Sequence, residues 1–148
     1  MDYFEKIMRF RNIYNTFPLK NGVICTEFTK ERGVAKLTVG KEHLNANNIM
    51  HGAVAFMLAD TVSGLYVSID ECMHTTASAS INFMRACHVG DELTAVATMK
   101  KSGRKIDYIN VDIADQNGRL IAQAIFTYYN LDRPVFAEHP EAALEDKE

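Results

Sequence analysis

The sequence of 148 residues has no surplus of positive charge, few cysteines and no apolar stretch among its first residues. Its formal net charge is −3, which argues against a broadly basic surface for nucleic acid. The three cysteines, Cys25, Cys72 and Cys87, show no Cys-x-x-Cys spacing, so we expect free thiols in a reducing cytoplasm. The first residues, MDYFEKIMRFR, carry charge throughout and do not look like a secretory signal peptide.

A long uninterrupted hydrophobic run is also missing. The most apolar stretch, residues 51–69, reads HGAVAFMLADTVSGLYVSI. Polar or small residues interrupt it at Asp60, Thr61, Ser63, Gly64 and Ser68. A membrane span needs about 20 predominantly apolar residues, so we expect no membrane association. We predict instead a helix that is buried on nearly all sides inside the protein.

The first part of the chain predicts a helix followed by a hairpin. A hydrophobic content of 47% is enough for the core of one domain over residues 1–148. Apolar residues at helical spacing predict an amphipathic helix over 3–14 that ends near Pro18. We expect it to pack on the core or form a lid, since its apolar face lacks the basic flanks of a membrane-surface helix. Two β-rich runs, 23–29 and 34–39, predict a hairpin.

After the long helix, hydrophobic residues recur at every second position. Alternation predicts four strands, at residues 75–84, 92–100, 105–114 and 119–129. Asn117-Gly118 between the last two is a strong hairpin signal. The acidic tail, residues 137–148, is expected to be frayed or to form a short exposed helix. The fold class is therefore α+β, with an antiparallel sheet packed on one central helix and an N-terminal helix added.

The long helix carries chemical groups at its start and in its middle. If it begins near His51-Gly52, its first N–H groups have no intrahelical partner and can stabilise a negative oxygen, and Gly52 lets a ligand approach. Asp60 supplies a carboxylate that can act as a base or a nucleophile. Two structural alternatives remain open. Asp60 can be satisfied by Thr61, Ser63 or the backbone, and His51 can be an ordinary polar residue at a helix start.

These two features lie too far apart to serve one site within one helix. Asp60 follows His51 by nine residues, which is about 13 Å along a helix axis. Two such helices packed antiparallel would bring each Asp60 to the other's His51-Gly52, and a two-fold axis does this twice. The sequence therefore predicts a homodimer if the two features act together.

Several stretches of the chain match a known family. They are HLNANNIMHGA at 43–53, LADT at 58–61, INFMR at 81–85, VGD at 89–91 and NGRLIAQ at 117–123. Together they resemble hotdog-fold acyl-CoA thioesterases, and the PaaI-like branch of the phenylacetate pathway in particular. The resemblance covers about residues 20–130. It implies a sheet wrapped around the long helix, dimers that often pair into tetramers, and active sites at the dimer interface.

The resemblance also implies roles for individual residues. Asp60 matches the acid that activates water or attacks the thioester, and the Gly52 N–H matches the oxyanion donor. His51 matches a residue that polarises or positions the carbonyl, and Asn45 one that orients water or substrate. Thr76 falls where relatives carry a hydroxyl residue that assists the acid. CoA is part of the substrate, so no separate cofactor is implied.

The sequence departs from the family pattern at two positions. The usual His-Gly-Gly is His51-Gly52-Ala53, which keeps the donor glycine and adds a methyl group near the site. The usual Arg-Pro is Arg85-Ala86, which relaxes the turn after the strand. Arg85 is nevertheless a candidate for binding CoA.

A second candidate CoA site is the basic turn between the predicted strands 92–100 and 105–114. It contains Gly103, Arg104 and Lys105, preceded by Lys100 and Lys101, and basic side chains suit the phosphates of CoA. The alternative is a solvated hairpin tip. No zinc site is expected, because no metal-ligand spacing joins the cysteines to His43, His74, His88 and His139.

Two other functions are weighed against thioester hydrolysis. A non-enzymatic acyl-CoA-binding protein would keep the fold but lose the acid, and Asp60 is present. A hotdog dehydratase carries a proline-rich loop around its histidine, and none of the three prolines lies near His51. Five side chains are candidates for the pocket wall or for the core: Phe56, Met57, Tyr66, Phe83 and Met84.

Overall fold

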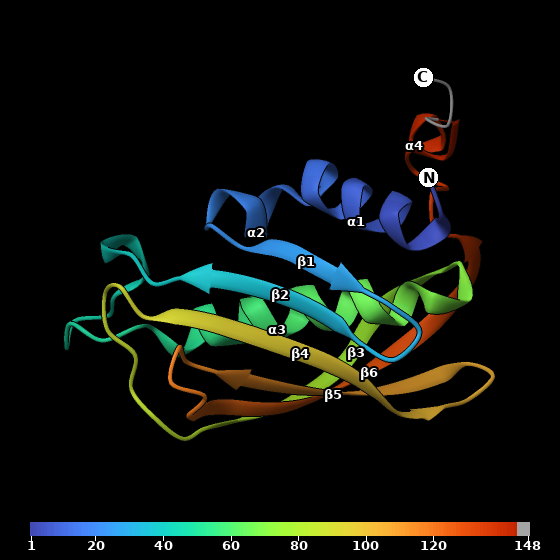
Figure 1. Ribbon diagram of the computed structural model, residues 1–148. Coiled ribbons are helices and arrows are strands. Elements are labelled where there is room, and N and C mark those ends of the chain that lie inside the picture. Colours follow the sequence, from blue (N-terminus) through green and yellow to red (C-terminus); the bar gives the residue numbers. More distant parts are fainter. Residues whose placement is uncertain (145–148) are drawn as a thin grey trace.

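The computed structural model describes residues 1–144, and its six strands form one antiparallel sheet that curls around a single long helix (Figure 1). The strands are β1 Ile24–Phe28, β2 Gly33–Thr38, β3 Cys72–Phe83, β4 Glu92–Ser102, β5 Ile106–Ala114 and β6 Leu120–Pro134. The helices are α1 Tyr3–Tyr14, α2 Thr16–Lys20, α3 Gly52–Val67 and α4 Pro140–Leu144, with 3-10 turns η1 Lys41–His43 and η2 Ser68–Asp70. The predicted α+β class is confirmed.

The sheet follows the order β1-β2-β4-β5-β6-β3, and its inner face holds the core. The period of two in the sequence sends alternate residues towards α3. On β5 the inward side chains are Ile109, Val111 and Ile113, all at most 1% exposed. On the neighbouring strands the inward positions include alanines, such as Ala95 and Ala124, which let the sheet approach the helix closely.

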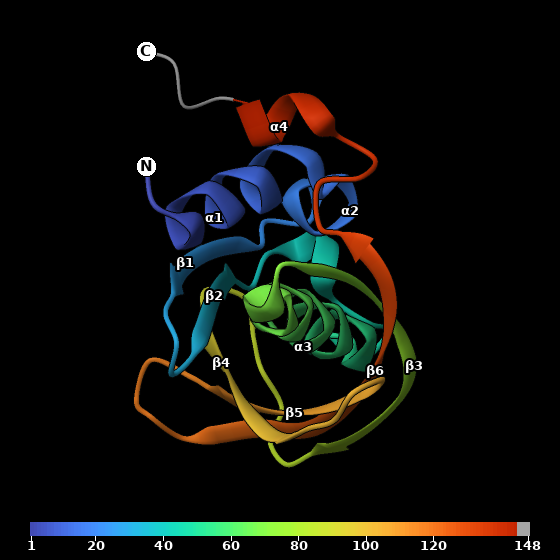
Figure 2. The same cartoon turned by 90° about the vertical axis from the view of Figure 1, so that its right-hand side faces the viewer.

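The central helix α3 is covered on most of its circumference but not on all of it (Figure 2). Leu58, Val62 and Leu65 are fully buried against the sheet. A stripe along the helix through Ala53, Phe56 and Asp60 stays partly or fully open, and Phe56 is 37% exposed. The prediction of a helix buried on nearly all sides was therefore wrong for this stripe, because the curled sheet of one chain does not close around it.

The length and hydropathy of this helix alone would allow it to cross a membrane. The stretch Gly52–Asp70 has a mean hydropathy of 1.5, and 56% of it is buried inside the molecule. Burial against a sheet is the ordinary situation of a core helix in a globular domain. This packing agrees with the interpretation of the stretch as a core helix.

The N-terminal segment covers the β1 edge of the sheet, as a packing helix would. On α1, Ile7 is fully buried, and Phe4 stacks edge-on against Phe28 of β1 with ring centroids 4.9 Å apart. The first helix ends at Tyr14, as predicted, but a second short helix, α2, contains Pro18. Proline is tolerated there because it lies in the first turn, where backbone N–H groups lack intrahelical partners.

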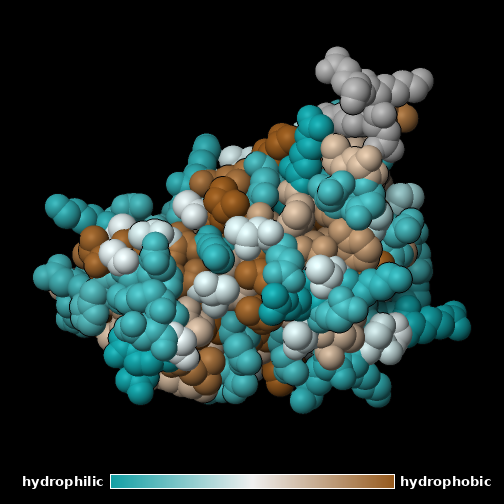
Figure 3. Space-filling view, viewed as in Figure 1, coloured by the Kyte–Doolittle hydropathy of each residue, from teal (hydrophilic) through white to brown (hydrophobic). Residues whose placement is uncertain are grey.

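The opposite edge of the sheet is formed by β3, which pairs only with β6 among the strands described. Its residues 75–80 are all exposed. This edge is turned away from the viewer in Figures 1 and 3 and lies at the right of Figure 2. The face shown in Figure 3 is mostly hydrophilic, with the larger apolar areas in its upper part, where α1 and α2 pack over β1.

The C-terminal tail forms a helix that is partly covered. In α4, Ala142 is only 5% exposed, and the Lys6 ammonium donates to the carbonyl of Ala143 at 3.0 Å. The expected short exposed helix is thus present but docked beside α1. Residues 145–148, the rest of the predicted acidic tail, lie outside the described part of the chain.

Candidate active site

The carboxylate of Asp60 lies on the open stripe of α3 and is held by side chains from two strands. Its Oδ1 accepts hydrogen bonds from the Thr76 hydroxyl of β3 at 3.0 Å and from the Tyr128 hydroxyl of β6 at 3.2 Å. Within residues 1–144, Oδ2 has no hydrogen-bond partner, so it is open to a water or a substrate. Thr61 and Ser63 instead bond to backbone carbonyls of α3, and neither satisfies the carboxylate.

The contact between Thr76 and Asp60 agrees with the role that the resemblance implies, but Tyr128 was missed. Tyr128 is 3% exposed, and its oxygen lies 2.7 Å from the Ser63 hydroxyl. Burial, with the Asp60 carboxylate adding to it, holds the pKa of Tyr128 well above its usual value, so the phenol keeps its proton. The signal in the sequence was a tyrosine at an inward position of β6, where a buried hydroxyl needs a partner.

Tyr128→Phe is expected to lower kcat about 10- to 100-fold with little change in KM. A hydrogen bond to a charged group contributes about 1.5–3 kcal/mol, and its loss frees the carboxylate to rotate. Steady-state hydrolysis measures the effect. Tyr129→Phe is the matched control, since Tyr129 is 42% exposed on the other face of the same strand. If the Tyr128 variant keeps the wild-type kcat, the Tyr128 hydroxyl does not assist the reaction and the side chain serves only in packing.

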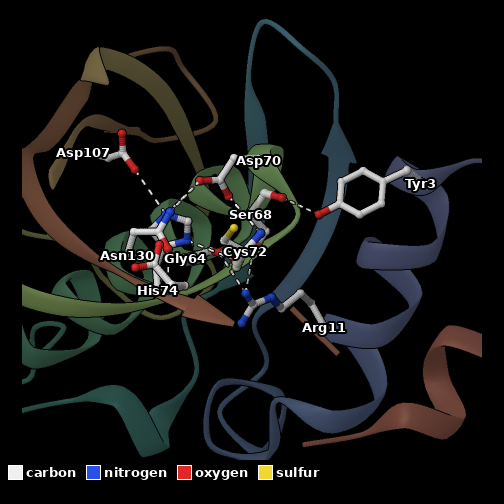
Figure 4. Close-up of polar contacts among 10 residues, drawn as sticks. Tyr3, Arg11, Gly64, Ser68, Asp70, Cys72, His74, Asp107 and Asn130 are labelled. Carbon is white, nitrogen blue, oxygen red and sulfur yellow. Dashed lines mark hydrogen bonds and ion pairs between the residues drawn. The ribbon is translucent and has the colours of Figure 1, made fainter. Parts of the chain in front are cut away.

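A cavity of about 480 Å³ opens beside Asp60, between α3 and the N-terminal helices. Phe56 and Met57, which were candidates for either a pocket wall or the core, form part of its wall. Arg11 of α1 also lines it, and its Nη2 donates to the carbonyl of Gly64 at 3.0 Å and to the Ser68 hydroxyl at 2.8 Å (Figure 4). Burial lowers the pKa of the Arg11 guanidinium. Sequence reasoning missed Arg11, which lies one helical turn after the buried Ile7.

The start of α3 offers hydrogen-bond donors. His51 is the N-cap, and its Nδ1 accepts the Ala53 N–H at 3.0 Å. A neutral His51 in this arrangement carries its proton on Nε2, which is free to donate to a carbonyl oxygen. The N–H of Gly52 has no hydrogen-bond partner among the described residues. Both features fit the expected oxyanion site.

A second cavity, of about 410 Å³, lies at this end of the helix and contains Asn45, Gly52 and Arg85. The side-chain oxygen of Asn45 accepts the Asn47 N–H at 2.8 Å, which fixes the preceding loop and leaves the amide nitrogen for a ligand. Phe83 and Met84 line this cavity rather than the first one. The structure thus brings Asn45, Gly52 and Arg85 together, but it does not bring them to Asp60 of the same chain.

The remaining predicted residues are divided between the surface and the core. Gly103 and Arg104 lie in the exposed β4–β5 turn, and Lys105 forms an ion pair with Asp132, which offsets part of its charge. In Figure 1 this turn lies at the end of the molecule where α3 ends, opposite the loop that leads into α3. Tyr66 is a core residue that donates to the carbonyl of Lys30 at 2.9 Å, so it is not part of either pocket wall.

Comparisons with known proteins identify the family and the fold that this chain shares. A family model described as the thioesterase superfamily matches residues 47–122. An Archaeoglobus fulgidus protein, assigned only provisionally as an esterase, is 33% identical over 104 residues, covering 69% of this chain and 68% of that protein. The acyl-coenzyme A thioesterase PaaI of Escherichia coli is 28% identical over 89 residues, covering 60% of this chain and 64% of that protein. The structure of E. coli PaaI superimposes with a TM-score of 0.81 over 90% of this chain and 99% of its own.

A hypothetical thioesterase from Streptococcus pneumoniae, solved with coenzyme A, gives a TM-score of 0.73 at 28% identity. The match covers 76% of this chain and 91% of that one. In two further structures of that protein, an aspartate and a threonine sixteen positions apart are each replaced by alanine. Asp60 and Thr76 are separated by the same sixteen positions.

Proposed function

Because the chain belongs to the thioesterase superfamily and has the hotdog fold of PaaI-like thioesterases, we propose that it hydrolyses acyl-CoA thioesters in sites shared by two subunits of a homodimer. Each site joins Asp60 of one subunit to the helix start of the other. CoA enters only as part of the substrate, and no added cofactor is required.

In the proposed reaction, the thioester carbonyl oxygen lies against the partner subunit's Gly52 N–H and the partner subunit's His51. These donors stabilise the negative charge that develops when the carbonyl carbon is attacked. The attacking group is a water deprotonated by Asp60, or the Asp60 carboxylate itself, whose mixed anhydride water then cleaves. In both routes the C–S bond breaks, the CoA thiolate takes a proton, and the acyl group leaves as a free acid.

The observation that carries the proposal is the division of the catalytic groups between two cavities of one chain. Gly52 and Asp60 are separated by eight residues of α3, about 12 Å along its axis. Asp60 opens into the first cavity and Gly52 into the second. A second, antiparallel α3 would complete both sites at once, as a two-fold dimer requires.

The β3 edge supports this dimer and suggests how the subunits join. A twelve-residue edge strand exposes a row of unpaired backbone groups, which proteins rarely leave uncovered. Exposed apolar side chains, Phe83 and Met84, stand at its end beside the second cavity. Pairing β3 with β3 of a second copy would extend the sheet and bring the open stripes of the two α3 helices together. Assembly of two such dimers into a tetramer in the cytoplasm belongs to the same proposal.

The same arrangement gives the basic turn a function. The β4–β5 turn lies where α3 ends, so an antiparallel partner helix would start close to it (Figure 1). Arg104 and Lys105 would then meet the phosphates of the CoA whose thioester lies at the partner subunit's Gly52. Arg85, which lines the second cavity, is the other candidate for phosphate binding.

Hydrolysis is favoured over passive binding of acyl-CoA by the way Asp60 is held. A carboxylate fixed by two hydroxyl donors with one oxygen left open is arranged for chemistry, and a binding protein needs no such group. Release of CoA from a panel of short, medium, long and aryl acyl-CoAs tests the activity and identifies the acyl group. No release from any of them would contradict the proposal.

Mixed dimers test whether the site is shared. Asp60→Asn and Gly52→Pro homodimers are both expected to be nearly inactive. A heterodimer of the two, isolated with two affinity tags, carries one site with both groups intact, so its activity should recover to about half of wild type. If the tagged heterodimer remains as inactive as its parents, Asp60 and Gly52 act within one subunit and the shared site is wrong.

A further inference from the structure

A second polar cluster lies near the end of α3, and one of its members, His74, lines the same cavity as Asp60. It contains Asp70 of η2, His74 of β3 and Asp107 of β5, whose nearest side-chain donor atoms all lie within 4.8 Å of one another (Figure 4). The Nε2 of His74 is 3.2 Å from Oδ2 of Asp70 and 3.2 Å from Oδ2 of Asp107. Nothing in the proposed hydrolysis uses these three side chains.

Two of the three side chains are buried, and each has one polar atom that no hydrogen bond satisfies. The side chains of His74 and Asp107 are 1% and 6% exposed. Both His74 Nε2 and Asp107 Oδ1 are buried without a hydrogen-bond partner among the described residues. Leaving such groups unpaired is costly, so each requires a compensating partner.

Hydrogen bonds to the backbone and to a neighbouring amide fix the orientation of the His74 and Asp70 side chains. The Nδ1 of His74 lies 3.0 Å from the carbonyl of Cys72, to which it can donate its proton. This leaves the lone pair of Nε2 directed towards the two carboxylates. The Oδ1 of Asp70 accepts the Cys72 N–H at 3.0 Å, and its Oδ2 accepts from the Asn130 amide at 3.2 Å. A histidine with one nitrogen on a backbone carbonyl and the other on a metal is the usual arrangement at metal sites.

We propose that Asp70, His74 and Asp107 bind a divalent transition-metal ion, best matched by Zn²⁺. Tetrahedral Zn²⁺ with ligands at about 2.0–2.1 Å places neighbouring ligand atoms about 3.3 Å apart. The two nitrogen–oxygen separations of 3.2 Å fit that spacing. One imidazole and two carboxylates are a mixed ligand set that suits Zn²⁺ better than Mg²⁺ or Ca²⁺. Asp70, with a side chain 40% exposed, leaves room for a water as fourth ligand and a path of entry.

A bound ion would clamp three elements at this end of the sheet. Asp107 lies opposite Tyr128 in the β5–β6 register, and His74 lies opposite Asn130 in the β3–β6 register. Thr76 follows His74 by two residues. The ion would therefore stiffen the strands that carry both hydroxyl donors to Asp60, without itself entering the reaction.

This site could not be predicted from the sequence, because its ligands do not follow a local motif. His74 and the cysteines have no metal-ligand spacing, and the carboxylates come from a turn and from a strand on the other side of β6. Only the register of β3, β6 and β5 brings them together.

The test is titration of the chelator-treated full chain with ZnCl₂ by isothermal calorimetry. We expect one Zn²⁺ per chain and a rise in melting temperature with Zn²⁺ concentration. Asp107→Asn and Asp70→Asn are expected to weaken binding by about a hundredfold or more, because loss of a supporting group alone costs about 10- to 100-fold. Asp70→Asn is the safer variant for folding, since its side chain is partly exposed.

Two controls separate the site from general metal binding. Asp112→Asn removes an exposed carboxylate from the same strand as Asp107, and Cys72→Ser removes the nearby thiol. Both should bind Zn²⁺ as wild type does. Co²⁺ should give a tetrahedral visible spectrum in wild type that is absent in His74→Gln. The proposal is overturned if wild type binds Zn²⁺ no more tightly than the Asp70 variant.

Discussion

Asp60→Asn is expected to lower kcat by about a thousandfold or more. General base catalysis contributes about 10²- to 10⁴-fold, and an amide can neither accept the proton of water nor attack a thioester as a carboxylate does. The amide oxygen can still accept the hydrogen bonds from Thr76 and Tyr128, so the side chain should keep its place. Release of CoA from the best acyl-CoA of the panel measures the change.

The fold of the Asp60→Asn variant should be unaffected or slightly more stable. The substitution removes a partly buried charge and keeps the shape of the side chain. A melting temperature equal to or above that of wild type would therefore assign the loss of activity to chemistry. Activity within tenfold of wild type would mean that another group activates the water, and the role of Asp60 would have to be abandoned.

The loss in Asp60→Asn should also exceed that in Thr76→Val. The Thr76 hydroxyl donates to Oδ1 of Asp60 and also contacts the Tyr128 hydroxyl, so its removal loosens the carboxylate but leaves its charge. We expect the kcat of Asp60→Asn to be far below the kcat values of Thr76→Val and Tyr128→Phe. A reversed ordering would indicate that the hydroxyl groups, and not the carboxylate, perform the reaction.

Local patterns predicted the elements and those site residues that sit within a motif. The alternation of β5 and the apolar spacing of α1 are local, and the structure follows both. Asn45 and Gly52 lie beside and at the start of α3, and Asp60 lies in its middle, all within the stretch that the resemblance covers. The contact of Thr76 with Asp60 was implied by the family and not by spacing, since the two are on different elements.

Contacts made across the sheet could not be predicted in the same way. Tyr128 reaches Asp60 only because β6 pairs with β3 in one register, and a shift of one residue would turn the phenol away from α3. Arg11 reaches the end of α3 because α1 packs over β1, which depends on the whole core. The open stripe of α3 was missed for a related reason, because apolar composition does not show which face of a helix the curled sheet leaves uncovered.

Gly52→Pro compared with Gly52→Ala isolates the backbone donor of the oxyanion site. Proline suits the first position of a helix, and His51, at φ −62° and ψ 136°, has the backbone conformation that a following proline requires. The substitution therefore removes one N–H and keeps the start of α3. Loss of one oxyanion donor costs about 10²- to 10³-fold in kcat, and that is the effect expected for the proline variant.

Alanine at the same position controls for the added atoms. A Cβ there would lie 3.2 Å from the Phe83 ring, so the ring must shift slightly in both variants. Gly52→Ala keeps the N–H and should stay within about tenfold of wild type, in line with a small steric cost. Measured as kcat on the same acyl-CoA, the gap between the two variants reports the loss of the N–H at position 52 together with the two extra ring carbons of proline. If both variants lose activity equally, the space beside Phe83 matters and the N–H does not, and the helix start holds the substrate without stabilising its oxyanion.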